Sequence, residues 1–202
     1  MQELVFATHN EHKAVEIQAI LSQDYRILSL DDVKFQDPVP ENENSLEGNA
    51  SQKAWYVHNR LGKDCFADDT GLEVECLNGA PGVYSARYAD LTNERKADEP
   101  ASEANIRKLL AAMQGETNRR ARFRTIIALI LEGKEYIFEG IVEGEIIGER
   151  KGSGGFGYDP VFLPSGYNET FAEMSLEQKN IISHRALAVL KLVTFLKKYG
   201  PG

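Results

Sequence analysis

The chain has 202 residues, enough for one sizeable domain or for two lobes around a common core. Its apolar content of 42% and charged content of 27% are ordinary for a soluble globular protein. The net charge of −8 argues against a general nucleic-acid-binding protein, which needs a basic surface, although a few local cations suffice for a nucleotide site.

The sequence predicts a cytoplasmic protein. The N-terminus, MQELVFATHNEHK, has neither a basic region nor a long apolar stretch, so we expect no signal peptide. Because no apolar run reaches about 18 residues, we expect no membrane span. The two cysteines, Cys65 and Cys76, are expected to be free thiols in a reducing compartment.

Strands and helices alternate in the first part of the chain. We expect a strand over 3–8, a helix over 11–23, a strand near 25–30, a polar loop over 36–50, a helix from Ala50 to Leu61 and a strand over 64–68. Thr8 and Glu11 have the spacing of a capping box for the first helix. The strand 64–68 runs into Asp68 and Asp69, which we expect to enter a turn at Thr70-Gly71.

The second part favours antiparallel strands. We expect a helix over 102–113 capped by Ser102, a long strand pair or meander over 122–133 and 134–149, a glycine-rich loop with a short strand over 150–164, a helical turn over 175–180 capped by Ser175, and a helix over 183–200 capped by Ser183. Alternating strands and helices followed by antiparallel strands predict an α/β protein with a mixed sheet. Ligands of such sheets gather beyond the strand ends.

The segment THNEHK, Thr8 to Lys13, lies where the first strand meets the first helix. Free backbone N–H groups and the helix dipole favour an anion there. Thr8 and Asn10 add hydrogen-bonding side chains, and Lys13 adds a cation. We interpret the segment as a phosphate cradle, the alternative being an ordinary helix cap with a surface lysine.

Asp68, Asp69 and an acid from PENEN form a candidate carboxylate group. Mg²⁺ prefers oxygen ligands and typically takes one or two carboxylates plus substrate phosphates. A metal-bound triphosphate also needs a base for the attacking water. The alternative is a turn decorated with acids. Arg87, near the end of the glycine- and proline-rich loop 78–89, could pair with one of the acids.

The loop GSGGFGYDP, residues 152–160, combines glycines with two aromatic rings. Glycines let the backbone approach a ligand closely, and Phe156 and Tyr158 offer flat faces on which a base could stack. A hinge loop is the alternative.

His184 and Arg185 begin the last helix, where cations are disfavoured unless an anion or carbonyl oxygen faces them. Arg185 could donate to a keto oxygen or a phosphate, whereas the alternative for His184 is a surface histidine near the cap. Lys53 and Lys179 are further candidate phosphate cations, and each could equally be a solvated helix lysine.

The four motifs THNEHK, FADDTGLEVECLNGAPGVYSARYA, GGFGYDPVFLP and SHRALA occur in this order from near the start to near the end of the chain. Together they closely resemble the family of non-canonical purine nucleoside triphosphate pyrophosphatases, the inosine and xanthosine triphosphatases. The resemblance implies one domain over residues 1–202, with an elongated, two-lobed α/β fold in which helices flank a long twisted mixed sheet and a central nucleotide cleft.

The resemblance also implies an activity. Such enzymes hydrolyse inosine, deoxyinosine and xanthosine triphosphates to the monophosphate and pyrophosphate, which cleanses the nucleotide pool. They use Mg²⁺ and are usually homodimers. A pocket with hydrogen-bond donors at the 6-keto group would reject adenine, whose 6-amino group leaves those donors unpaired.

Roles carried over by position are as follows. Asp69 matches the general base, which is also linked to the metal, and Thr70 matches the neighbouring substrate contact. Further substrate residues implied are Thr8, His9, Asn10, Glu11, His12 and Lys13 at the phosphates, Lys53 near the triphosphate, Phe156, Gly157, Tyr158 and Asp159 at the base, and Lys179, His184 and Arg185 over the purine and its keto group. Counting back from Asn49-Ala50 favours Glu41 as the second metal carboxylate, with Glu43 as the alternative.

Three features depart from the family pattern or lie outside it. Thr70 replaces the commoner serine but keeps the hydroxyl, and Gly48 stands where a glutamate is usual. The polar insertion 93–103 is expected to be a surface loop. Two other functions stay open: a related house-cleaning pyrophosphatase for another modified nucleotide, and a non-catalytic nucleotide sensor.

Overall fold

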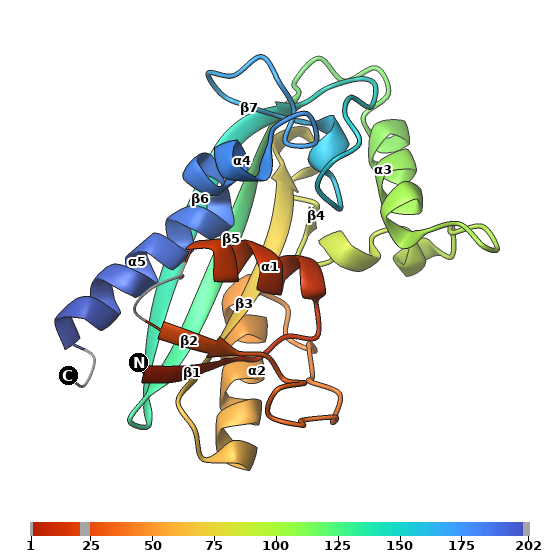
Figure 1. Cartoon of the computed structure of the whole chain (residues 1–202). Helices are drawn as coiled ribbons and strands as arrows, with labels where there is room; N and C mark the ends of the chain where they lie inside the picture. Colours follow the sequence, from red (N-terminus) through yellow and green to blue (C-terminus); the bar gives the residue numbers. More distant parts are fainter. Residues whose placement is uncertain (1, 21–24, 200–202) are drawn as a thin grey trace. The chain divides into compact units, whose positions relative to one another are not determined.

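Parallel strands connected through helices begin the fold. The computed structural model describes residues 2–20 and 25–199. In it, β1 (Gln2–Phe6) pairs in parallel with β2 (Tyr25–Leu28) and with β3 (Cys65–Val74). Helix α1 (Glu11–Ile20) lies between β1 and β2 in the chain, and α2 (Leu46–Leu61) precedes β3 (Figure 1). Parallel neighbours need such crossover connections, so the predicted α/β alternation is confirmed.

Antiparallel pairing follows in the rest of the chain. The strand order is β2-β1-β3-β5-β6-β7, with β4 paired to β3 in antiparallel fashion. The remaining elements are β4 (Pro81–Gly82), α3 (Ala101–Ala112), β5 (Arg120–Leu131), β6 (Lys134–Ile146), β7 (Phe162–Pro164), α4 (Leu176–Ile182) and α5 (His184–Tyr199), with short 3-10 helices at Glu75–Leu77, Ser85–Arg87, Asp90–Thr92 and Asp159–Val161. The sheet is therefore mixed, as the sequence predicted.

The chain divides into two compact units. Unit 1 comprises Met1–Asp69, Thr125–Gly140 and Asn180–Gly202, and unit 2 comprises Thr70–Arg124 and Ile141–Lys179. The long strands β3, β5 and β6 each contribute residues to both units.

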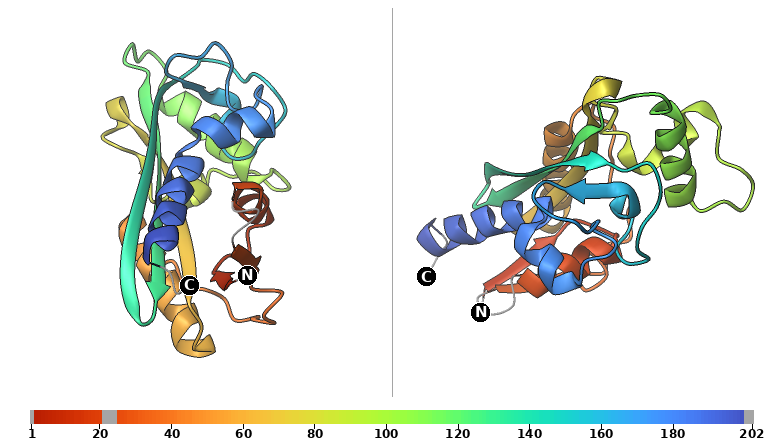
Figure 2. Two further views of the ribbon diagram at one scale, coloured as in Figure 1. Left: turned by 60° about the vertical axis from the view of Figure 1, so that its left-hand side comes forward. Right: turned by 90° about the horizontal axis from the view of Figure 1, so that it is seen from above.

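The core of unit 1 is formed where α5 packs on the sheet. Figure 2 shows α5 running along the strands. The buried side chains in this core include Leu4, Phe6, Phe66, Ile127, Leu129, Val189, Leu192 and Leu196. The rings of Phe6 and Phe66 stack with centroids 4.6 Å apart. A Cβ atom at Gly140 would meet the His184 carbonyl oxygen and Ala188, so only glycine lets α5 lie this close to β6.

Unit 2 has a separate aromatic core. Phe123 of β5 lies edge-on to Phe162 of β7, with centroids 4.6 Å apart, and Phe171 lies near both rings. From α3, the buried apolar side chains include Ile106 and Leu109. Each unit thus buries apolar surface of its own.

Two predicted helix starts are confirmed and two are wrong. Ser175 Oγ accepts a hydrogen bond from Gln178 N, and Ser183 Oγ accepts one from Ala186 N, as caps do. In contrast, α3 starts after Pro100 without a side-chain cap, so Ser102 does not cap it. At α1, Asn10 takes the capping role predicted for Thr8, because its Oδ1 accepts from Lys13 N at 3.2 Å.

The predicted turn at Thr70-Gly71 is also wrong. Strand β3 continues through both residues to Val74, because Leu72 and Val74 are buried and β4 pairs with this end of the strand. Likewise α2 begins inside the segment predicted as loop, where Ser45 accepts a hydrogen bond from Gly48 N. Strand β1 stops at Phe6, and residues 21–23 of the first predicted helix lie outside the described residues.

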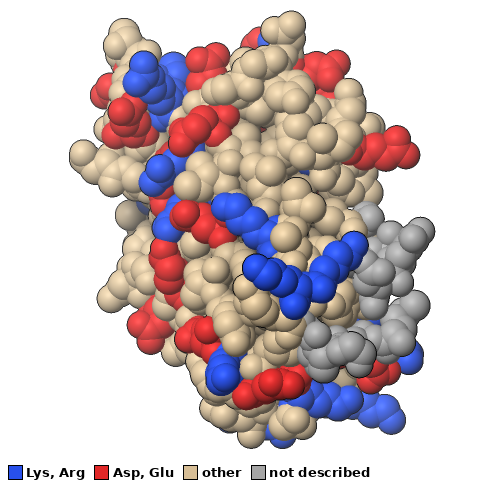
Figure 3. Space-filling view, turned by 90° about the vertical axis from the view of Figure 1, so that its left-hand side faces the viewer, with Lys and Arg blue, Asp and Glu red and all other residues tan. Residues whose placement is uncertain are grey.

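Among the described residues, no helix combines the length and apolarity that a bilayer crossing needs. On the face shown in Figure 3, acidic and basic side chains lie beside one another, with one group of basic side chains near the centre.

Candidate active site

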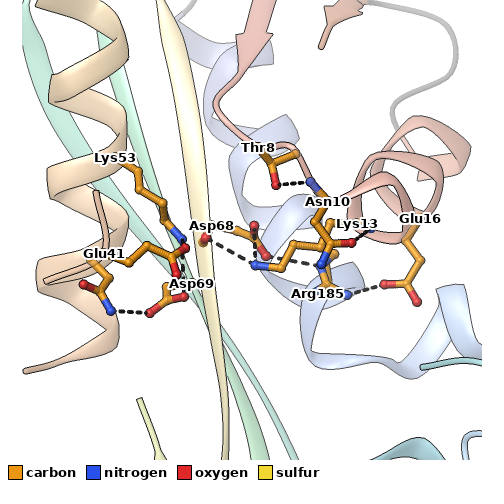
Figure 4. A network of polar contacts seen from close by, with 10 residues as sticks. Thr8, Asn10, Lys13, Glu16, Glu41, Lys53, Asp68, Asp69 and Arg185 are labelled. Carbon is orange, nitrogen blue, oxygen red and sulfur yellow. Dashed lines mark hydrogen bonds and ion pairs between the residues drawn. The ribbon is translucent and has the colours of Figure 1, made fainter. Parts of the chain in front are cut away.

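The two adjacent aspartates of β3 face opposite sides of the strand. Successive side chains of a strand alternate in direction, so a strand that continues through Asp68 and Asp69 must separate them. Figure 4 shows Asp68 on the side of Lys13 and Arg185, and Asp69 on the side of Glu41 and Lys53. The predicted carboxylate pair is therefore two carboxylates with different surroundings.

Asp68 belongs to a buried network of charges. Its Oδ1 lies 2.9 Å from Lys13 Nζ, and its Oδ2 lies 3.3 Å from Arg185 Nε. Arg185 also pairs with the buried Glu16 of α1. Burial by itself would raise the pKa of Asp68, but Lys13 and Arg185 outweigh it and keep that pKa below its usual range. Asp68 is thus an ionised partner of two cations near neutral pH.

Asp69 and Glu41 share one lysine on the other side of β3. Lys53 Nζ, from α2, lies 2.5 Å from Glu41 Oε1 and 3.3 Å from Asp69 Oδ1. Burial raises the pKa of Asp69, and the nearby lysines offset this only in part. Burial also opposes ionisation of Glu41, yet Lys53 outweighs it and lowers the pKa of Glu41. Two carboxylates facing one ammonium leave this side with excess negative charge.

These two carboxylates fit a magnesium ion better than a metal with nitrogen or sulfur ligands. The described residues contain no group of three or more His, Cys, Asp or Glu side chains that could enclose a metal. Mg²⁺, however, commonly takes one or two carboxylates and completes its shell with water and substrate phosphates. The Glu41 and Asp69 oxygens converge on the position of the Lys53 ammonium, a point where a cation is favoured. Glu43 packs beside Gly48 instead.

The predicted phosphate segment lies at the start of α1. His9, Asn10 and His12 are exposed there, and Thr8 Oγ1 accepts a hydrogen bond from Asn10 N at 3.1 Å. Glu11 is the first residue of the helix. The ammonium of Lys13 turns toward Asp68 rather than into solvent, and burial lowers the pKa of Lys13. The segment thus combines exposed polar groups with one half-buried cation.

The glycine-rich loop of unit 2 is organised by Asp159. Its Oδ2 accepts hydrogen bonds from Lys179 Nζ at 2.7 Å and from Phe156 N at 2.8 Å. A Cβ atom at Gly155 would collide with this carboxylate, and Gly155 has a φ of +69°. Lys179 Nζ also lies 4.9 Å from the centre of the Phe156 ring. Lys179 is therefore a buried partner of Asp159, not a solvated lysine.

The two aromatic rings of this loop differ in exposure. Tyr158 is buried, and its hydroxyl donates to the Ser85 carbonyl at 2.9 Å, so the stacking face predicted for it is covered. Phe156 is half-buried. Gly157, between them, has a φ of +61° with open space where a Cβ would lie. Arg87 lies over the Tyr84 ring.

Comparison with known sequences identifies the family. The family model described as "Ham1 family" matches residues 4–195. The chain belongs to the Ham1 family. It is 52% identical over 198 residues to the "dITP/XTP pyrophosphatase" of Porphyromonas gingivalis, covering 97% of this chain and 98% of that protein. It is 50% identical over 194 residues to the protein of the same name from Flavobacterium johnsoniae, covering 96% and 97% of the two chains.

Solved Ham1 structures have the same fold. The chain is similar to a HAM1 protein from Coxiella burnetii with a TM-score of 0.86 and 34% identity, covering 98% of this chain and all of the other. The Ham1 protein of Staphylococcus aureus gives a TM-score of 0.85 at 38% identity, covering 98% and 99% of the two chains. The mixed α/β fold is therefore that of Ham1 proteins.

In this Ham1 chain, sequence reasoning missed two buried polar residues. Glu16 pairs with Arg185, and Asn49 Nδ2 donates to Asp69 Oδ2 at 3.1 Å. Helical spacing was the available signal, because Glu16 follows Lys13 by three residues and Asn49 precedes Lys53 by four. His184, for which a surface position was one alternative, is buried. The free thiols predicted for Cys65 and Cys76 are confirmed.

Proposed function

We propose that this chain hydrolyses dITP, ITP and XTP to the nucleoside monophosphate and pyrophosphate, and so removes non-canonical purines from the nucleotide pool. The observation that carries the proposal is the Glu41–Lys53–Asp69 cluster: a buried carboxylate with a raised pKa beside a second carboxylate and a lysine. The near full-length similarity to relatives named dITP/XTP pyrophosphatase supports the choice of substrate.

Asp69 is the proposed general base. A carboxylate whose pKa is raised by burial is a stronger proton acceptor near neutral pH than an exposed one. Asp69 takes a proton from water as the water oxygen bonds to the α-phosphorus, and the bond to the β-phosphate oxygen breaks to release pyrophosphate. Positioning and charge neutralisation carry most of the acceleration in such reactions.

Glu41 and Asp69 are the residues proposed to bind Mg²⁺. When bound, the ion neutralises phosphate charge and polarises the phosphoryl oxygens. Lys53, whose ammonium lies beside both carboxylates, is proposed to contribute a positive charge near the phosphates.

Recognition of the substrate is proposed to use two sets of residues. The phosphates are assigned to Lys53 and to the start of α1, namely Thr8, His9, Asn10, Glu11, His12 and Lys13. Thr70 contacts the substrate beside Asp69. The purine is assigned to Phe156, Gly157, Asp159, Lys179, His184 and Arg185, and the buried Tyr158 is proposed to support this loop through its hydroxyl. Arg185 donors at the 6-keto oxygen would discriminate against adenine, because a 6-amino group leaves them unpaired.

The test is product analysis. The purified protein is incubated with Mg²⁺ and, separately, with ITP, XTP, dITP, GTP and ATP, and pyrophosphate is measured against orthophosphate. We expect pyrophosphate from the first three and little from GTP or ATP. Release of orthophosphate, or turnover of ATP equal to that of ITP, would contradict the proposal. A folded protein that binds these nucleotides without turnover would instead be a nucleotide sensor.

We also propose that the protein acts as a cytoplasmic homodimer. The family resemblance supports the dimer, and sequence composition supports the compartment. Light scattering coupled to size-exclusion chromatography should give twice the chain mass of 22.5 kDa. A single-chain mass at micromolar concentration would contradict the dimer.

A further inference from the structure

Asn49 connects the two carboxylates of the candidate metal site through one buried amide. It lies in the first part of α2 and is 1% exposed. Its Nδ2 donates to Asp69 Oδ2 at 3.1 Å, and its Oδ1 accepts from Glu43 N at 2.9 Å. Both ends of the amide are therefore engaged, one by β3 and the other by the segment that carries Glu41.

The chemistry of the partners fixes the orientation of this amide. A backbone N–H only donates, so the Asn49 oxygen must face Glu43 and the amide nitrogen must face Asp69. If the Asn49 amide were rotated by half a turn, its NH₂ group would face the backbone N–H of Glu43, and two buried donors facing each other are costly. Asp69 thus accepts a hydrogen bond from the uncharged amide of Asn49 on Oδ2, while the Lys53 ammonium lies near Oδ1.

A second side chain of α2 anchors the same loop without touching Asp69 in any hydrogen bond described. Gln52 Oε1 accepts from Asn42 N at 2.9 Å. Consecutive backbone N–H groups, of Asn42 and Glu43, are therefore both accepted by α2 side chains. The loop also packs closely on the helix: a Cβ atom at Gly48 would lie only 2.7 Å from Glu43 Cβ.

We propose that Asn49 is a positioning residue that sets the carboxylate of Asp69 and couples it to the Glu41 segment, so that both carboxylates meet the same cation. The proposal rests on the proposed function of this site. It gives a physical reason for Gly48 in this chain: a side chain there would push the Glu41–Asn44 segment away from α2.

Three variants separate the two arms of the amide. Asn49→Asp keeps an acceptor for Glu43 N but replaces the donor to Asp69 by a second negative charge, whereas Asn49→Ala removes both hydrogen bonds without adding a charge. Gln52→Ala is the matched control, since it removes one anchor of the loop and leaves the Asp69 hydrogen bond in place. For each variant, kcat and KM for ITP are measured at saturating Mg²⁺, and folding is checked by thermal unfolding.

We expect kcat to fall about 10- to 100-fold in Asn49→Asp and Asn49→Ala, as is typical when a residue supporting a metal ligand is lost, while KM for ITP stays within about threefold. Gln52→Ala should keep kcat within about threefold of the wild type. A near-normal kcat in Asn49→Asp would overturn the proposal. So would an equal loss in Gln52→Ala, because the loop anchor alone would then explain the effect.

A binding measurement makes the test independent of turnover. Mn²⁺ binding is followed by electron paramagnetic resonance in the presence of inorganic pyrophosphate, and Asn49→Ala should weaken it about tenfold or more relative to the wild type. Unchanged Mn²⁺ affinity would overturn the role of Asn49. If the wild type releases no pyrophosphate from ITP but Asn49→Ala still weakens Mn²⁺ binding, the proposed function fails while the role of Asn49 stands.

Discussion

Asp68 and Asp69 are neighbours in the sequence but differ in almost every physical respect. Asp68 has two cations, Lys13 and Arg185, and its pKa is lowered. Asp69 shares Lys53 with Glu41, and its pKa is raised. The comparison shows how a strand with two-residue periodicity can place a carboxylate held by two cations next to one that shares a single cation with a second carboxylate. The charges around each carboxylate set the direction of its pKa shift, and the proposed role of Asp69 as a base rests on that difference.

The largest expected effect is on catalysis by Asp69→Asn. Asparagine has nearly the same shape but cannot accept the proton from water, so we expect kcat for ITP to fall at least about 10³-fold. This loss combines the missing general base with the loss of one proposed metal ligand. Substrate binding by isothermal titration with an uncleavable ITP analogue should be retained. A turnover within tenfold of the wild type would show that another group is the base.

Asp68→Asn should instead act mainly on stability. It leaves the buried Arg185 and the half-buried Lys13 without their carboxylate, and breaking a buried ion pair such as that of Arg185 costs about 3 kcal/mol or more. For a chain of this length we expect the unfolding temperature to fall by roughly 6–12 °C. If Asp68→Asn and the wild type unfold at the same temperature, the two aspartates do not differ as described.

Glu16→Gln offers a milder perturbation of the Asp68 side. The amide oxygen can still accept from Arg185, but one negative charge is lost from the buried network. We expect about 1–2 kcal/mol of destabilisation, less than for Asp68→Asn, because the hydrogen bond is kept and only the contribution of the negative charge to it is lost. Urea unfolding with an unchanged m-value would measure it. Destabilisation larger than that of Asp68→Asn would show that Glu16, not Asp68, contributes more to the stability of this network.

The smallest effect should be seen at Cys65, three residues before Asp68 on β3. Burial, with a contribution from Asp64, raises the pKa of Cys65 to about 12, so at pH 8 its thiol is both covered and protonated. With a thiol reagent we expect rapid labelling of the half-buried Cys76 alone in the wild type and in Asp69→Asn. Labelling of Cys65 in Asp68→Asn would show that the ion pairs of Asp68 are needed to keep the Cys65 thiol inaccessible to the reagent. Rapid labelling of Cys65 in the wild type would contradict its burial.

Local patterns predicted most elements and failed where neighbours in space decided. The helix containing Ala54 was predicted because its apolar residues recur at helical spacing, and the C-terminal helix was predicted from the capping serine Ser183 and the lysines near its end. The turn predicted at Thr70-Gly71 was wrong because a glycine and two acids are typical of turns, whereas burial of Leu72 and pairing with β4 keep the chain extended. The insertion 93–103 was predicted to be a surface loop. All of its residues, 93–103, are exposed or half-buried, while Ala101 to Glu103 already belong to the first turn of α3.

For the candidate site, the sequence by itself determined the inventory: the acids, lysines and glycines stand in motifs whose order is specific enough to indicate the family. The tertiary structure alone decided the pairings. Arg185 reaches Asp68 across 117 positions and Glu16 across 169, distances along the chain over which no spacing rule operates. Strand alternation then separated Asp68 from Asp69, and helix α2 brought Lys53 and Asn49 to the second of them. The sign of a carboxylate's pKa shift depends on burial and on the charges around it, and both exist only once the chain is folded.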